Sequence, residues 1–193
     1  MNIIKNRKQL PSFIKIEKNI DVNKLLNCFK TFVHSQDNIS ATCGTPYLSD
    51  NYLQMTLTSA IEDMKYVRDK EDERCYGKLN EEYQGTYVED ILNTFKSKYT
   101  RVRIIKKKPC SYILPHIDYD TTYSVRYYIP LQTNPWAMTA VQNNEVVDVM
   151  NLKADGSMYF VNPGLPHSAW NFGKEDDIRM VVSVNGQDDL PNI

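Results

Sequence analysis

The spacing of apolar residues divides this chain into two parts, with the change near position 100. Before that point two stripes recur at intervals of three or four residues, which predicts amphipathic helices. Asp21 could cap the first helix, and Thr86-Tyr87-Val88-Glu89 has the form of a capping box at the start of the second. The two stripes are Val22, Leu25, Leu26, Phe29 and Val33, and then Val88, Ile91, Leu92 and Phe95.

Residues 37–85 lie between these two helices and show no sustained period. They mix polar and charged residues with Gly44, Pro46, Gly77 and Gly85. We therefore predict loops here, with one helix near residues 57–67. Irregular segments often carry specificity, so we expect this region to cover the mouth of a pocket.

From Val102 onward the pattern changes to short runs with a period near two, which predicts antiparallel strands. In residues 123–131 the odd positions share one face, whereas Ser124, Arg126 and Tyr128 share the other. An arginine therefore points into a defined face. Asn143-Asn144 predicts a hairpin turn. The other predicted strands are residues 138–142, 145–150, 157–161, 167–171 and 178–184.

Together these elements predict a mainly β chain with N-terminal helices. Seven or eight short strands favour a sandwich or jelly roll whose outer face is covered by the helices. A chain of 193 residues fits one domain. We expect residues 1–100 to form mostly helical support and pocket cover, and residues 101–193 to form the catalytic core.

Charge and hydropathy narrow the range of partners. Lys and Arg number 23 against 24 Asp and Glu, a formal charge of −1, which gives no electrostatic reason to expect nucleic acid or an anionic membrane. The run Lys106-Lys107-Lys108 is expected to be a solvated strand end, with an anionic partner as the alternative. No apolar run has signal-peptide or membrane-spanning length, so we expect a cytoplasmic protein.

The four cysteines lie far apart in the sequence. Cys28, Cys43, Cys75 and Cys110 form no C-x-x-C pair, which argues against a zinc knuckle and a redox dithiol. We expect free thiols, and two disulfides are the alternative.

His116-Ile117-Asp118 places an imidazole and a carboxylate two residues apart. On a strand both side chains would point to the same face and could share one metal ion. The chain has only three histidines. His167, at the start of a late predicted strand, is the candidate third ligand, whereas His34 is expected to be a surface residue. Two histidines and one carboxylate leave other positions open, as ferrous oxygenase sites do. The alternative is a pair of hydrogen-bonded strand histidines.

Arg179 follows His167 by twelve residues and would lie on a neighbouring strand. Its guanidinium could hold one end of a dicarboxylate whose 2-oxo acid end chelates the metal. Two other functions remain open. The same ligands could hold zinc for hydrolysis, although a hydrolase needs no carboxylate anchor there, or the fold could be a non-catalytic binding module.

Residues 103–184 resemble the aspartyl/asparaginyl β-hydroxylase family of 2-oxoglutarate oxygenases. The resemblance implies a double-stranded β-helix that uses Fe(II), 2-oxoglutarate and dioxygen to hydroxylate an amino-acid side chain, free or within a peptide. The matching segments are Pro115-His116-Ile117-Asp118, Val125-Arg126-Tyr127-Tyr128-Ile129-Pro130-Leu131, Asp155-Gly156-Ser157-Met158-Tyr159-Phe160, His167-Ser168-Ala169-Trp170-Asn171 and Arg179.

The resemblance also implies roles for single residues. His116 and His167 would be iron ligands, joined by Asp118, a carboxylate that some members lack. Arg179 would bind the distal carboxylate of 2-oxoglutarate. Arg126 would lie near the co-substrate, and a buried salt bridge to Asp118 or Asp120 is its alternative role. We also assign Tyr128 to the co-substrate site, at a position where some members have histidine. Tyr119, Tyr123, Trp136 and Trp170 are candidate substrate walls, with ordinary packing as the alternative.

Overall fold

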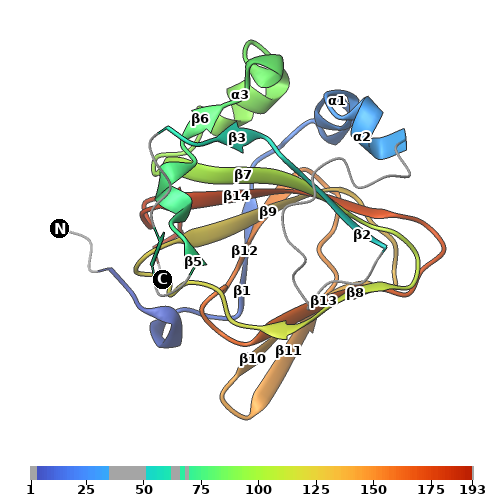
Figure 1. Ribbon diagram of the computed structural model, residues 1–193. Helices are drawn as coiled ribbons and strands as arrows, with labels where there is room; N and C mark the ends of the chain where they lie inside the picture. Colours follow the sequence, from blue (N-terminus) through green and yellow to red (C-terminus); the bar gives the residue numbers. More distant parts are fainter. Residues whose placement is uncertain (1–3, 35–50, 62–65, 68–69, 193) are drawn as a thin grey trace.

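Two antiparallel sheets face each other in the computed structural model, which describes residues 4–34, 51–61, 66–67 and 70–192. The larger sheet has the strand order β1-β12-β9-β14-β7-β2 and the smaller has β11-β10-β13-β8 (Figure 1). This pair of sheets is the predicted double-stranded β-helix. Their strands are β1 (Phe13–Glu17), β2 (Tyr52–Thr56), β7 (Lys98–Lys107), β8 (Ser111–His116), β9 (Val125–Gln132), β10 (Ala137–Asn143), β11 (Val146–Met150), β12 (Ser157–Val161), β13 (His167–Asn171) and β14 (Asp177–Asn185).

Three short helices lie on the outer side of the larger sheet: α1 (Val22–Asn27), α2 (Lys30–His34) and α3 (Tyr87–Leu92) (Figure 1). Asp21 caps α1 as predicted, because its side chain accepts a hydrogen bond from the N–H of Lys24 at 2.9 Å. Thr86 caps α3 by accepting from the N–H of Val88. Glu89 does not complete the expected capping box, because its carboxylate accepts from the N–H of Gly85 instead.

The apolar stripes of these helices form the main core with one face of the larger sheet. Leu25 and Phe29 pack in this core with Val125 and Tyr127, which are odd positions of β9. Because side chains alternate along a strand, the even positions of β9 point to the other face, between the two sheets. The predicted outer cover of helices therefore explains why Arg126 faces the interior.

The described residues of the first hundred are not mostly helical, so for them this prediction was wrong. Besides β1 and β2, this half contains short strands and three 3-10 turns, and the predicted helix at 57–67 is absent from its described residues, which hold β3 and β4. β1 and β2 complete the larger sheet, and the short strands pair with each other. The sequence of a short polar segment does not predict such pairing, because it depends on tertiary contacts. Residues 35–50, 62–65 and 68–69 lie outside the described part. The remaining elements are β3 (Thr58–Ser59), β4 (Tyr66–Val67), β5 (Lys70–Glu71), β6 (Lys78–Leu79), η1 (Arg7–Gln9), η2 (Glu73–Cys75) and η3 (Glu81–Tyr83).

The lysine run is not a solvated strand end. Lys106 and Lys107 are both buried in the larger sheet and point to opposite faces. Lys106 donates to the carbonyls of Phe32 and Val33, so its cation lies at the C-terminus of α2, where carbonyls lack helical partners. Lys107 turns inward and pairs with Asp177, its neighbour across the sheet.

The late strands match their predicted positions closely. The hairpin between β10 and β11 turns one residue later than expected, because Asn143 still belongs to β10. Asn144, which has a φ of +56°, is the first residue of the turn. Cys28, Cys75 and Cys110 form no disulfide within the described part of the chain, and Cys43 lies outside it. Within the described ranges, no helix is long and apolar enough to cross a membrane.

Candidate metal and co-substrate site

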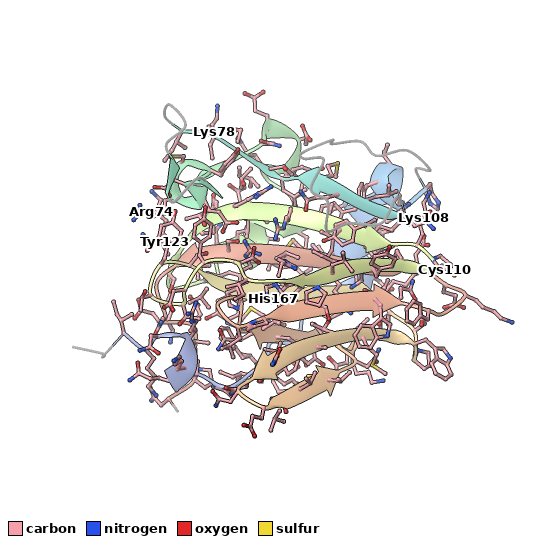
Figure 2. All side chains as sticks on the ribbon, turned by 60° about the horizontal axis from the view of Figure 1, so that its bottom comes forward. Arg74, Lys78, Lys108, Cys110, Tyr123 and His167 are labelled. Atoms are coloured by element: carbon pink, nitrogen blue, oxygen red, sulfur yellow. The ribbon has the colours of Figure 1, made fainter. Side chains whose placement is uncertain are left out.

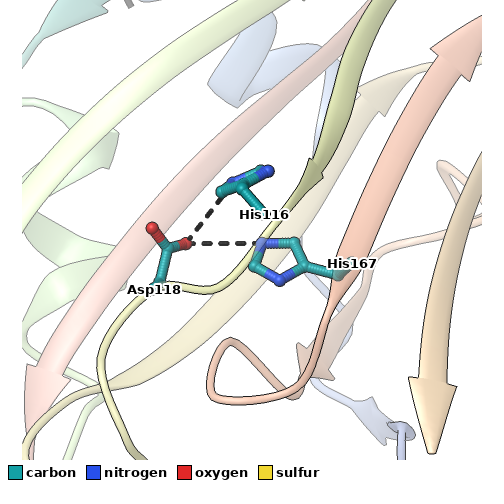
Figure 3. Close-up of side chains that lie close together, drawn as sticks. All are labelled: His116, Asp118 and His167. Carbon is teal, nitrogen blue, oxygen red and sulfur yellow. Dashed lines mark ion pairs between the residues drawn. The ribbon is translucent and has the colours of Figure 1, made fainter. Parts of the chain in front are cut away.

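Three of the predicted site residues converge between the two sheets. His116 ends β8 and His167 begins β13, and the two residues are direct partners across these strands. Asp118 lies beyond the end of β8, where its N–H donates to the carbonyl of Pro163 at 2.9 Å. The Nε2 atoms of His116 and His167 lie 3.8 and 3.3 Å from Oδ2 of Asp118 (Figure 3). All three ligand atoms lie within 4.8 Å of one another, close enough to share one metal ion.

Backbone carbonyls fix the orientation of both imidazoles. Nδ1 of His116 lies 2.8 Å from the carbonyl of Leu114, and Nδ1 of His167 lies 2.9 Å from the carbonyl of Leu165. A carbonyl only accepts, so each Nδ1 carries a proton, and each Nε2 faces Asp118 and is the ring atom that a metal would bind. Burial, followed by the charge of His167, lowers the pKa of His116, which favours the neutral form that binds metal.

Arg126 keeps Asp118 ionised. Burial alone would raise the pKa of this carboxyl group, but Arg126 and the two imidazoles outweigh it and hold the pKa well below its usual range. Arg126 donates through Nη1 to Asp118 and through Nη2 to Glu73, the latter at 2.7 Å. The salt bridge to Asp118 foreseen as the alternative role is therefore present, and Arg126 also lines the cavity.

Glu73 is a site residue that the sequence did not reveal. It lies in η2, within the segment predicted as loop, and its side chain is buried against Arg126. Its neighbours anchor this turn, because Asp72 accepts hydrogen bonds from both Arg74 and Tyr123. Figure 2 shows Arg74 beside Tyr123, with the guanidinium carbon 4.5 Å from the ring centre. No local pattern marks a carboxylate whose partner lies 53 residues away.

Arg179 is buried on β14 of the larger sheet, so it does not lie on a strand that pairs with β13 of His167, and that expectation was wrong. Its Nε pairs with Asp177 at 2.9 Å, and its Nη1 donates to Oγ1 of Thr139 at 2.7 Å. The buried Nη2 has no hydrogen-bond partner among the described residues. A buried guanidinium nitrogen without a partner is costly, so an incoming carboxylate oxygen would satisfy it.

One cavity is lined by both His116 and His167 and by Arg179. Its empty space, including the open mouth, measures about 420 Å³. Tyr128 lines it, and the assignment of this residue to the co-substrate stays a prediction. The remaining lining residues are Tyr52, Arg103, Ile105, Lys107, Ile113, His116, Arg126, Thr139, His167, Ser168, Ala169 and Arg179.

The four aromatic residues proposed as substrate walls do not line this cavity. Tyr119 and Tyr123 stack on each other with ring centres 4.4 Å apart. Trp136 is 67 % exposed. Trp170 follows His167 by three positions, so it leaves the opposite face of β13 and packs near Phe172 on the outside. Packing, the alternative reading, therefore holds for Trp170, and Tyr52 and Tyr128 are the aromatic walls.

Lys107, which lines the cavity, forms an ion pair with Asp177, and its Nζ lies 2.6 Å from Oδ2 of Asp177. Burial, reinforced by the charge of Arg179, lowers the pKa of Lys107 to about 8.

We expect Asp177→Asn to lower the free energy of unfolding by about 3–5 kcal/mol, because it leaves two buried cations without a carboxylate. Urea unfolding would measure the loss. Asp90→Asn, the same change on exposed α3, should cost under about 0.5 kcal/mol, and equal losses would contradict the pairing.

Comparison with known proteins decides the family. The sequence model of the family described as aspartyl/asparaginyl beta-hydroxylase matches residues 82–186, a little over half of the chain. The chain belongs to this family. It is accordingly an oxygenase that depends on Fe(II) and 2-oxoglutarate. A search of curated proteins finds no significant match.

Solved structures from several organisms are similar to this chain. An oxidoreductase of the 2OG-Fe(II) oxygenase family from Burkholderia pseudomallei has a TM-score of 0.59 at 11 % identity, over 91 % of this chain and 85 % of its own. HygX from Streptomyces hygroscopicus, with nickel and 2-oxoglutarate bound, has 0.52 at 7 %, over 89 % and 82 %. The viral collagen prolyl hydroxylase of Paramecium Bursaria Chlorella virus-1 has 0.51 at 14 %, over 90 % and 96 %. At these identities the likeness shows the shared fold.

Proposed function

We propose that His116, Asp118 and His167 hold the iron, that Arg179 binds the distal carboxylate of 2-oxoglutarate, and that the enzyme hydroxylates an amino-acid side chain, free or within a peptide. The observation that carries this proposal is the buried Nη2 of Arg179, which lacks a partner among the described residues, on a side chain that lines the same cavity as His116 and His167. Two histidines and one carboxylate are the donor set that ferrous oxygenases use.

The bound iron would supply the oxidising chemistry, with decarboxylation of 2-oxoglutarate to succinate coupled to hydroxylation of a nearby carbon. The residues of this chain supply position and environment. The two backbone carbonyls keep both imidazoles aimed at the metal, and Arg126 keeps Asp118 ionised. Tyr52 and Tyr128 wall the cavity and limit access of water.

The choice of an amino-acid side chain as substrate rests on the family, whose name describes hydroxylation of aspartyl and asparaginyl residues. Zinc-dependent hydrolysis fits less well, because it gives no role to the partnerless nitrogen of Arg179. A binding module without turnover gives no role to two imidazoles whose Nε2 atoms converge with a carboxylate. A cytoplasmic location remains part of the proposal, and the lack of disulfides at Cys28, Cys75 and Cys110 in the described structure is compatible with it.

Anaerobic addition of Fe(II) and 2-oxoglutarate tests the proposed site. Bidentate chelation should give a weak visible charge-transfer band that zinc-loaded and metal-free protein lack. Admission of dioxygen should then give succinate, and a screen of free amino acids and peptides should find one that gains a single oxygen by mass. Absence of both the band and succinate would refute the oxygenase assignment, whereas succinate without any hydroxylated amino acid would refute only the substrate class.

A further inference from the structure

The cavity contains more positive charge than its own carboxylates can neutralise. Four cations line it: Arg103, Lys107, Arg126 and Arg179. Three carboxylates face them. Asp118 and Glu73 are both held by Arg126, and Asp177 is shared by Lys107 and Arg179. Glu73 also lies 3.8 Å from Arg101, so it is already shared by two guanidinium groups.

Arg103 is the cation left over. It forms no ion pair within 4.0 Å in the described part of the chain, and its buried Nε has no hydrogen-bond partner there. Burial, and then the charges of Arg126 and Arg101, lower the pKa of Arg103, which shows that its surroundings disfavour the cation. An unpaired guanidinium in such a place is stabilised by any ligand that brings a carboxylate.

Its place in the sheet separates Arg103 from the proposed co-substrate anchor. Arg103 lies on β7 opposite Val181, whereas Arg179 lies two residues earlier on β14, opposite Ile105. Two residues correspond to about 7 Å along a strand. Arg179 is almost fully buried, but Arg103 is only partly buried and is therefore on the more open side of the cavity.

We infer that Arg103 is a second carboxylate anchor, which binds an acidic group of the substrate. This inference rests on the proposed function, because both carboxylates of 2-oxoglutarate are already assigned there, one to Arg179 and the other to the metal. Fe(II) and the 2-oxoglutarate dianion cancel in charge, so their binding leaves the surplus cation at Arg103 in place. The substrate is accordingly a carboxylic acid, with the acid supplied by a free α-carboxyl group or by an acidic side chain.

Matched acids and amides test the inference. The full chain, loaded with Fe(II) and 2-oxoglutarate under argon, would be titrated calorimetrically with each free amino acid and its α-amide. A second arm would use end-capped hexapeptides that carry Asp or Asn at one internal position. We expect the acid to bind at least about tenfold more tightly than its amide in one arm, which identifies the source of the carboxylate. Arg103→Met should remove this preference.

Three further measurements separate the outcomes. Arg103→Lys should recover part of the preference, because the charge remains but the planar fork is lost. Lys98→Met, an equal loss of charge at an exposed position of the same strand, should change nothing. The charge-transfer band and the affinity for 2-oxoglutarate should survive in Arg103→Met. Equal binding of acid and amide in both arms, or a loss of 2-oxoglutarate affinity in Arg103→Met, overturns the inference, whereas absence of the band from the wild type overturns the proposed function.

Discussion

His167→Ala is expected to remove iron binding and, with it, all formation of succinate. The Nε2 of His167 lies 3.3 Å from Asp118 and is one of only three donors in the candidate site. Loss of a residue that merely orients a ligand typically weakens metal binding about 10- to 100-fold, so loss of a ligand should cost at least about 100-fold. Anaerobic titration with Fe(II), followed by the charge-transfer band in the presence of 2-oxoglutarate, measures the effect.

His34→Ala is the matched control for this prediction. His34 is exposed at the end of α2, on the helical side of the larger sheet, so its loss should leave iron affinity unchanged. If His167→Ala still binds Fe(II) as tightly as His34→Ala does, His167 is not a ligand and the site must be sought elsewhere.

Arg179→Met is expected to raise the KM for 2-oxoglutarate by about 10- to 100-fold while iron affinity stays within about threefold. Arg179 is not one of the proposed metal ligands, and its Nη2 is the nitrogen available for the distal carboxylate. Asp177 keeps Lys107 as a partner in this variant, so the fold should survive. Succinate formation at varied 2-oxoglutarate concentrations gives the KM, and a separate Fe(II) titration gives the metal affinity.

Two variants sharpen the assignment of Arg179. Arg179→Lys should fall between the wild type and Arg179→Met, because a lysine keeps the charge but cannot form two parallel hydrogen bonds. Arg7→Met, which removes a partly exposed arginine, should leave the KM unchanged. An equal loss of iron affinity in Arg179→Met and His167→Ala would show that the roles have been assigned wrongly.

The alternation of apolar and polar residues was sufficient to predict the later strands. It placed β12 and β13 at their observed positions and assigned Arg126 to the face opposite the helical core. The reason is that both faces of the larger sheet are covered, so the period of two records which side chains meet the helices and which meet the cavity. The pairing of His116 with His167 followed from chemistry, since these residue types suit one metal.

The tertiary structure alone decided which charges meet. The sequence shows Glu73 in an irregular segment and Lys107 in a run of lysines, and neither position indicates a buried partner. Only the folded chain brings Glu73 to Arg126 and Lys107 to Asp177, and leaves Arg103 without an ion pair among the described residues. Strand period determines the face on which a side chain lies, but its partner depends on which strands become neighbours, and that is set by packing between segments far apart in the sequence.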